Sequence, residues 1–457
     1  MREKFIMRKV ISVMLFTAVL CGCNGIENGS PIRPLAQDCV IVERSKNVKN
    51  PLYTPSIFKG DNDRLISAFE YGHFEVKGIK EKTANAHIVT SDDGGKTWTL
   101  RAKEFMTHGR IFKAGKSFYY LGHRGNLRIM KSDDNGETWS KAVDLTSKNE
   151  GKWHQSACNV WYKGDYIYLV MEVDMLPQKK LRAWNVSKLA PVVMRAKVSD
   201  DLTKRESWTF SNRVSMASLL EDYEKDELPQ LNFFGVPFYK QTYGEGGMLQ
   251  VNSPTSKVKR FYSPMGILET NIVQIKDKNH IWYDSTEKTF HLLMRANTGG
   301  TGYGALLKAV EKDDGSIQVG FEYVPSGKKI LFLPIPGGQM RFHIEYDEKT
   351  KLYWLLGTQA TDSMVKPNAI SDDLEHLGNN ERQRMVLHFS KNLVDWCFAG
   401  VVAKVEHPKA ARHYASMAID GDDLVILSRS GDENAKSAHD GNLITFHRVK
   451  NFRNLVY

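Results

Sequence analysis

The chain has 457 residues, of which 41% are hydrophobic and 25% charged, and its formal net charge is +10. This length and composition are those of a soluble globular protein with a substantial core, in one large domain or a few smaller ones. No long run of lysine and arginine occurs, so the charge indicates a mild preference for anionic ligands and excludes a nucleic-acid-binding signature.

The N-terminus is typical of an exported protein. A basic segment, MREKFIMRK, precedes an apolar run too short to span a bilayer, and Leu20-Cys21-Gly22-Cys23 resembles a bacterial lipobox. We expect residues 1–22 to be a signal peptide, Cys23 to carry acyl chains that anchor the protein, and residues 23–36 to form a polar tether. Ordinary secretory cleavage is the alternative. Asn24 favours the outer membrane, at its surface or periplasmic face. Loss of residues 1–22 lowers the net charge to +7 because four basic residues and one acid are removed.

Cysteine and glycine patterns predict no cofactor and no metal. The remaining cysteines, Cys39, Cys158 and Cys397, are odd in number and far apart, which argues against a disulfide framework or a structural zinc site. The chain has no HExxH motif and no phosphate loop. The segment TGGTGYG lacks the strand-to-helix setting of a nucleotide-binding loop.

Short strand-like segments and a repeated octet dominate the rest of the chain. SDDGGKTW at 91–98 recurs as SDDNGETW at 132–139, and degraded copies follow at 199–208 and 390–396. Each copy follows a short apolar run, and runs such as SFYYLG, DYIYLVMEV and KLYWLLGTQ continue the pattern. Helical periodicity is confined to a short candidate at 216–225. Repeated units of short strands predict an all-β propeller.

The octet predicts a structural turn. It fits the S-x-D-x-G-x-T-W Asp-box (BNR) pattern of the sialidase superfamily, which this chain resembles. The resemblance implies a six-bladed propeller over residues 37–457, with seven blades as an alternative. It places the box between the third and fourth strands of a blade, at the end away from the active site. We expect Asp93 and Asp134 to accept backbone N–H bonds within their turns and Trp98 and Trp139 to pack between blades.

Two segments resemble sialidase catalytic segments. LETNIVQI is similar to the segment that carries a catalytic glutamate, and an arginine ends the strand after it, which gives Glu269 and Arg295. RHYASMAIDGDDLVILSRS is similar to the segment that carries a nucleophilic tyrosine, which gives Tyr414. The resemblance implies that Tyr414 attacks the sugar and that Glu269 takes its proton. Arginine forks suit a sugar carboxylate.

The first blade departs from that pattern. Where sialidases have an arginine, the chain has Pro55-Ser56-Ile57, and the segment that normally holds the acid/base aspartate has His73 and Glu75 instead. These two residues and His154 are therefore the candidates for the acid/base. Polar residues at other strand ends predict a basic, histidine-rich mouth; they include His108, Arg110, His123, Arg124 and His439. The predicted substrate-binding residues are Arg295, Arg341, His343, Arg412, His413, Arg429 and Asn271.

These features favour an exo-acting glycoside hydrolase that removes a terminal, carboxylated sugar. Its partners are then an anionic glycan and, through the lipid anchor, a membrane. A polysaccharide lyase or uronate-directed hydrolase that uses histidine and tyrosine, with His154 or His413 as base, is the first alternative. A non-catalytic cell-surface propeller that binds glycans is the second.

Overall fold

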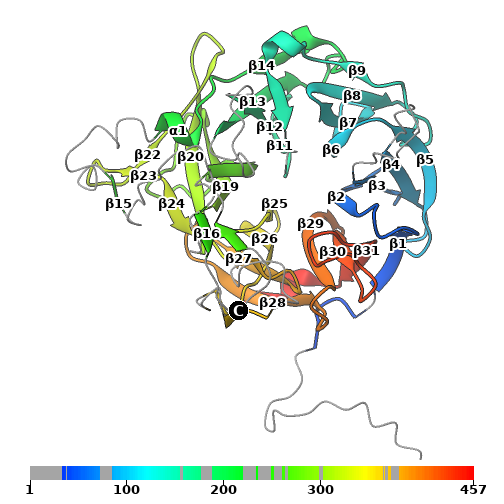
Figure 1. Ribbon diagram of the computed structural model, residues 1–457. Coiled ribbons are helices and arrows are strands. Elements are labelled where there is room, and N and C mark those ends of the chain that lie inside the picture. The colour runs from blue at the N-terminus through cyan, green and yellow to red at the C-terminus, as the bar shows by residue number, and fades with distance from the viewer. Residues whose placement is uncertain are drawn as a thin grey trace, which may run out of the picture. The chain divides into compact units, whose positions relative to one another are not determined.

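Six antiparallel sheets of four or five strands surround a central axis, as expected for a six-bladed propeller (Figure 1). The structure is a computed structural model that describes residues 33–37, 39–72, 85–154, 158–175, 188–219, 233–234, 249–251, 260–262, 266–297, 302–363, 365, 369–371 and 380–457. Residues 34–457 form one unit. The prediction of six blades is confirmed, and the seven-bladed alternative is wrong.

Each blade is an antiparallel meander of neighbouring strands. Blade 1 has β2 (Leu52–Lys59), β3 (Leu65–Tyr71), β4 (Ala86–Ser91) and β5 (Thr99–Glu104); blade 2 has β6 (Thr107–Ala114), β7 (Ser117–Arg124), β8 (Asn126–Ser132) and β9 (Val143–Asp144). Blade 3 has β10 (Lys152–His154), β11 (Trp161–Lys163), β12 (Tyr166–Asp174), β13 (Leu189–Lys197) and β14 (Trp208–Phe210). Blade 4 has β18 (Gly266–Val273), β19 (Thr289–Asn297), β20 (Tyr303–Glu311), β21 (Ile317–Gly320) and β24 (Phe332–Pro334).

The last two blades close the ring. Blade 5 has β25 (His343–Asp347), β26 (Leu352–Thr358), β27 (Arg384–Ser390) and β28 (Cys397–Lys404). Blade 6 has β29 (Ala411–Asp420), β30 (Asp423–Gly431) and β31 (Leu443–Val449), and its fourth strand is β1 (Cys39–Arg44) from the start of the chain. Pairing of β1 with β31 joins the start of the chain to its last blade and so closes the ring. Leu35 and Ala36, assigned to the tether from sequence, already hydrogen-bond to β28.

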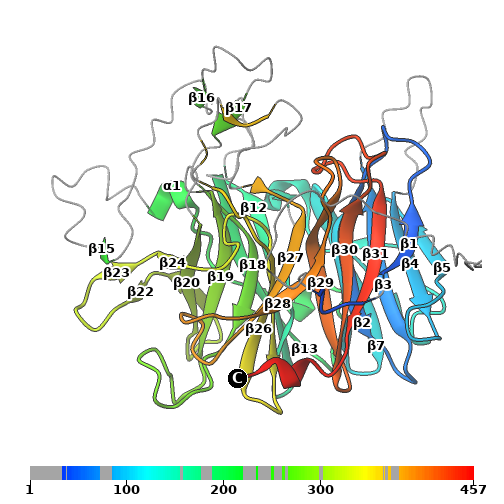
Figure 2. The ribbon, with the colours of Figure 1, turned by 90° about the horizontal axis from the view of Figure 1, so that it is seen from below.

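Smaller elements lie outside the blades. They are β15 (Phe233–Phe234), β16 (Leu249–Val251), β17 (Arg260–Tyr262), β22 (Glu322–Tyr323), β23 (Lys329–Ile330), α1 (Met216–Leu219) and the 3-10 turns at Lys148–Glu150, Arg205–Ser207 and Phe452–Leu455. The β16–β17 pair lies beyond one end of the blades (Figure 2). The predicted helix over 216–225 is confirmed only as α1, and its remaining residues lie outside the described ones. Among the described residues, no helix is long and apolar enough to cross a membrane.

The two octets form the predicted turns. The first joins β4 to β5 and the second joins β8 to β9, which are the third and fourth strands of their blades. Asp93 accepts hydrogen bonds from the backbone N–H groups of Lys96 and Thr97, each at 2.9 Å, and Asp134 accepts the equivalent bond from Thr138. These bonds confirm the prediction of a self-closing turn.

The octet tryptophans pack between blades, as predicted. Trp98 lies with its ring centroid 5.6 Å from that of Phe446 in blade 6, and its indole N–H donates to the carbonyl of Gly95. Trp139 packs against the apolar cluster that joins blades 1 and 2, which includes Ile66 and Ile111. The octets therefore stabilise contacts between neighbouring blades.

A second set of contacts joins the inner strands around the axis. At five of the blade junctions, a backbone N–H of one inner strand donates to a buried polar side chain of the preceding blade. The described pairs are Ile272 to Asn159, Ile344 to Asn271, Met417 to His343, Ile57 to Ser416, and Ile111 to Ser56, at 2.8–3.3 Å. These hydrogen bonds fix blades 3, 4, 5, 6, 1 and 2 to one another in that order. The core around the axis is therefore polar and hydrogen-bonded rather than purely apolar.

Candidate active site

The same backbone irregularity occurs near the start of four inner strands. Thr54, His108, Glu269 and Tyr414 have φ values of 42°, 51°, 58° and 51°, and each lies where the register with the second strand shifts. A non-glycine residue in this left-handed region costs about 1–3 kcal/mol, so the surrounding structure must impose it. Such bulges redirect side chains and concentrate next to active sites. The four side chains therefore mark one level of the propeller axis.

These bulges lie at the end of the blades opposite to the octets. The first and third strands of an antiparallel meander run in the same direction. Glu269 and Tyr414 lie near the beginnings of their first strands, whereas Asp93 and Asp134 follow the ends of third strands. The prediction that the octets lie away from the candidate active site is consistent with this topology.

Tyr414, Arg295 and Glu269 come together as the sequence predicted. The Arg295 guanidinium, at the end of β19, donates to the Tyr414 hydroxyl oxygen and lies 3.4 Å from a Glu269 carboxylate oxygen. Its Nε donates to the carbonyl of Gln339 at 2.8 Å, which fixes its direction. All three side chains are buried, with Glu269 only 1% exposed and Tyr414 9%. Arg295 therefore links the tyrosine to the carboxylate.

Three guanidinium groups surround the Tyr414 ring. The central carbons of Arg295, Arg382 and Arg429 lie 5.8, 5.6 and 5.3 Å from the ring centroid. They come from blade 4, from the segment before β27, and from β30. A fourth arginine, Arg341, donates from Nη1 to the backbone carbonyl of Tyr414 at 3.1 Å and so holds the bulge. The result is a buried, strongly cationic site around one phenol.

Burial and the neighbouring arginine charges shift the pKa of Tyr414 in opposite directions and the pKa of Arg382 in the same direction. Burial raises the pKa of Tyr414, while Arg295 and Arg382 act to lower it. Burial lowers the pKa of Arg382 to about 9, and the neighbouring charges of Arg429 and Arg295 act in the same direction. Burial of several positive charges close together, away from water, opposes folding. An anionic ligand would therefore reduce the electrostatic repulsion in this cluster.

Several other predicted residues have partners elsewhere in the fold. Asn271 and His343 are fully buried and accept two of the inter-blade hydrogen bonds described above. Both side chains therefore join neighbouring blades. His413 is fully buried with Nδ1 3.0 Å from Arg382 Nη1. Arg412 donates to the carbonyls of Ala411 and Gly431. His73, Glu75 and Cys23 lie outside the described residues.

Arg429 connects the cluster to blade 1. Its guanidinium lies 3.9 Å from the ring centroid of Tyr53 and donates to the carbonyl of His439. The Tyr53 hydroxyl in turn donates to Asp440 at 2.6 Å. Blade 1 therefore supplies a tyrosine, rather than an arginine, to this side of the site.

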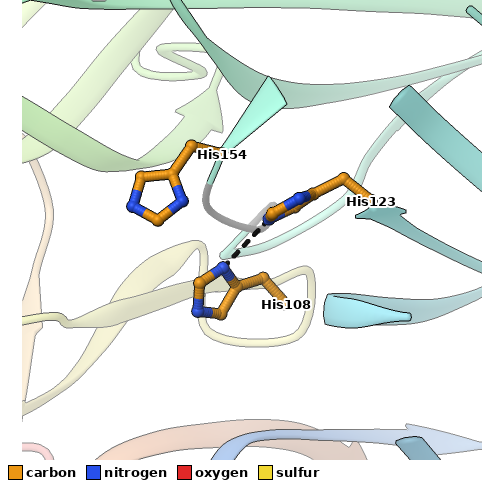
Figure 3. A group of neighbouring side chains, drawn as sticks. All are labelled: His108, His123 and His154. Atoms are coloured by element: carbon orange, nitrogen blue, oxygen red, sulfur yellow. Dashed lines mark hydrogen bonds between the residues drawn. The ribbon is translucent and has the colours of Figure 1, made fainter. Parts of the chain in front are cut away.

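A group of histidines lies on the neighbouring wall. His154, predicted as an acid/base candidate, lies close to His108 and His123 (Figure 3). Glu70 of β3 accepts the backbone N–H of His108 at 2.6 Å and the Thr54 hydroxyl at 3.1 Å. Burial raises the pKa of Glu70 to about 7, although these two hydrogen bonds oppose the shift. Of the residues predicted to line a histidine-rich mouth, His108, His123 and His154 lie together in this wall.

Arg382, Tyr53 and Glu70 are the site residues that the sequence analysis did not identify. Glu70 and Tyr53 lie within apolar strand sequences, where a single polar residue is commonly paired in the core. A weak signal was available for the bulges. The segments TPSI, HGRI, ETNI and YASM share a polar third residue and an aliphatic fourth, and each begins with the residue of positive φ.

Comparisons with known proteins give similarity in structure alone. No family model and no curated protein matches the chain. Solved structures that are similar include an α-L-arabinanase of Penicillium chrysogenum complexed with arabinobiose, with 10% identity, a TM-score of 0.48, and coverage of 93% of this chain and 100% of that one. The α-L-arabinofuranosidase Arb93A of Fusarium graminearum has 11% identity, a TM-score of 0.46 and coverage of 91% and 98%. A mutant of Trypanosoma rangeli sialidase displaying trans-sialidase activity has 12% identity, a TM-score of 0.49 and coverage of 93% and 61%. At these values the similarity assigns neither an activity nor a site residue to this chain.

Proposed function

We propose that the protein is a glycoside hydrolase that removes a terminal, carboxylated sugar from glycans, with Tyr414 as its nucleophile. The observation that carries this proposal is the buried contact in which Arg295 joins the Tyr414 hydroxyl to Glu269 inside a cluster of guanidinium groups. A core tyrosine needs one hydrogen-bond partner. Three arginines around a single phenol are costly to bury and suit a charged ligand.

The arginines would bind the sugar carboxylate. Arg295, Arg382 and Arg429 converge on the Tyr414 ring from different blades, so a carboxylate beside the ring can accept hydrogen bonds from two or more of them. A carboxylate bound in this way would bring the anomeric carbon next to the tyrosine oxygen. A neutral phenol nucleophile avoids the repulsion that a carboxylate nucleophile would meet from an anionic sugar.

In the proposed reaction the Tyr414 oxygen attacks the anomeric carbon as the glycosidic C–O bond breaks. Glu269 takes the phenol proton, and the departing oxygen receives a proton from a separate acid. The conjugate base of that acid then takes a proton from water, which cleaves the tyrosyl–sugar bond, and Glu269 returns its proton to the departing Tyr414 oxygen. His73, Glu75 and His154 remain the proposed sources of the acid.

A lyase is the second candidate, because a carboxylate clamp also serves β-elimination from a uronate. Neutralising the carboxylate acidifies the adjacent C–H bond, and elimination leaves an unsaturated product that absorbs in the near ultraviolet. The base of such a lyase would be His154 rather than His413, because His413 is fully buried against Arg382.

The test is a screen of glycans that end in sialic, ketodeoxy or uronic sugars, read by mass spectrometry and ultraviolet absorbance. We expect release of one free acidic sugar without absorbance. We also expect Tyr414→Phe and Glu269→Gln to lower kcat at least ~10³-fold in protein that still folds, with a lower melting temperature for Glu269→Gln because it removes the carboxylate paired with buried Arg295. Residual activity within a few-fold of wild type in both variants would refute the mechanism. An absorbing product would establish the lyase, and binding without any product would establish a non-catalytic propeller.

We also propose that the protein is exported and lipid-anchored through Cys23. The support is the lipobox-like sequence alone. Expressed in a bacterium, the wild type should partition with membranes and label with a palmitate analogue, whereas Cys23→Ser should be soluble and unlabelled. Membrane partitioning of Cys23→Ser would overturn the anchor.

A further inference from the structure

Three histidines from three strands meet where blades 2 and 3 adjoin. They are His108 of β6, His123 of β7 and His154 of β10, and one ring nitrogen of each lies within 4.8 Å of the others. The ring centroids are 5.2, 5.4 and 5.8 Å apart, so the rings form a nearly equilateral triangle. Figure 3 shows the imidazoles turned toward one another, with the hydrogen bond between His108 Nδ1 and His123 Nε2 at 3.0 Å.

The backbone holds each ring in place. His108 occupies the strained bulge, and Gly109 after it packs so tightly on Tyr120 that a Cβ there would lie 2.1 Å from the ring. The N–H of Trp153 donates to the carbonyl of Gly125 at 2.7 Å, which ties the strand of His154 to the end of the strand of His123. The backbone near His108 and His154 is therefore set by packing and hydrogen bonds before any ligand binds.

The carboxylate of Glu70 lies beside the His108 ring, on the side away from His123. His108 presents Nδ1 to His123 and Nε2 to Glu70, whose nearer oxygen is 3.6 Å away. Glu70 is itself fixed by the hydroxyl of Thr54 and the backbone N–H of His108. Metal-binding histidines commonly have a carboxylate near their second ring nitrogen, which sets the tautomer and increases the basicity of the ligating nitrogen.

From this geometry we infer that His108, His123 and His154 form a binding site for a divalent transition-metal ion of the zinc type. Three neutral imidazoles at the corners of a triangle are the ligand set of an open tetrahedral site, with a fourth position left for water or substrate. Zinc–nitrogen bonds of about 2.0–2.1 Å require nitrogens roughly 3.4 Å apart, close to the 3.0 Å between His108 and His123. Calcium and magnesium prefer oxygen ligands and do not suit three imidazoles.

The metal would lie beside the arginine cluster. Glu70 accepts the Thr54 hydroxyl, and the ring of the adjacent Tyr53 lies 3.9 Å from the Arg429 guanidinium, so the histidine wall adjoins the proposed carboxylate clamp. The open position can then bind a hydroxyl or carboxylate oxygen of the glycan. This role rests on the proposed function, whereas the affinity for metal does not. With its imidazole on a metal, His154 is not the proton donor, which leaves His73 and Glu75.

The experiment measures Zn²⁺ binding without glycan. The purified chain is stripped with chelator and titrated calorimetrically, and Co²⁺ is added separately for visible spectroscopy. We expect one equivalent of Zn²⁺ with sub-micromolar Kd, the intense bands of four-coordinate Co²⁺, and a melting temperature about 3 °C higher at 100 times Kd. Glu70→Gln should weaken binding about 10–100-fold.

Variants identify the ligands. His123→Ala and His154→Ala should each lose the stoichiometric binding and the Co²⁺ bands, while His407→Ala, which changes an exposed histidine of another blade, should retain both. No binding by the folded wild type, or unchanged binding in the His123→Ala/His154→Ala double variant, would overturn the inference. Because none of these measurements uses turnover, failure of the metal site would leave the tyrosine mechanism standing, and the reverse also holds.

Discussion

Replacement of Arg382 by methionine should make the protein more stable and less active. Arg382 is 2% exposed, and burial lowers its pKa far below the ordinary arginine value, to about 9. At about 1.36 kcal/mol per pKa unit, keeping this guanidinium charged in the folded state costs roughly 5 kcal/mol. Methionine has similar length and no charge. It removes hydrogen bonds to His413 and Asn380, which are worth about 2 kcal/mol together.

The difference predicts a gain of about 3 kcal/mol in the free energy of unfolding. For 457 residues, at about 2.1 cal/mol/K per residue, this corresponds to a rise of about 3 °C in Tm. Differential scanning calorimetry measures it, and turnover of the sugar found in the screen should fall at least ~10²-fold. Arg384→Met, two residues away and half-buried beside Glu381, should change neither quantity appreciably. A clear fall in the Tm of Arg382→Met would show that the guanidinium stabilises the fold, and the argument that it is held for a ligand would fail.

Three further predictions test the scaffold. Trp98→Ala should lower stability by about 2 kcal/mol through the lost contact with Phe446, yet leave kcat/KM within a few-fold; a large loss of activity would contradict the structural role of the octets. Asn271→Leu should cost about 2–4 kcal/mol in chemical denaturation because it orphans the Ile344 N–H and the Phe342 carbonyl of the next blade, and a neutral result would refute the inter-blade bonds. Burial raises the pKa of Glu345 to about 7, so the folded state keeps this proton up to a higher pH than the unfolded state does. As pH rises from 4.5 through 7, the free energy of unfolding of the wild type should therefore fall by about 3 kcal/mol relative to that of Glu345→Gln. Free energies of unfolding that change in parallel with pH in the two proteins would contradict this.

The fold was predictable because its signals are local. Each octet contains its own turn, since Asp93 bonds to residues three and four positions later. The apolar runs fixed most strands for the same reason. The blade boundaries and the closing strand β1 were harder to predict from the sequence, because the pairing of Cys39 with His447 joins opposite ends of the chain.

The candidate site was predictable only in part. Glu269, Arg295 and Tyr414 follow from resemblance to known segments, and the structure brings them together. Arg382 carries no local signal, because His413 and Tyr414, which it meets at the site, come from another blade. The left-handed backbone at Thr54 leaves no trace in hydrophobic periodicity. Proximity of His108, His123 and His154 likewise arises from the packing of two blades, and no ligand spacing in the sequence indicates it.

Identification of the residue that becomes covalently bonded to the sugar tests the central claim most directly. The folded protein is incubated with a fluorinated, activated analogue of the acidic sugar that the screen releases, which slows hydrolysis of the intermediate. Peptide mass spectrometry then locates the adduct. The mechanism predicts one sugar per chain, attached to Tyr414 and absent from Tyr414→Phe. An adduct on Glu269 or another residue, or full turnover of the natural sugar by Tyr414→Phe, would contradict it.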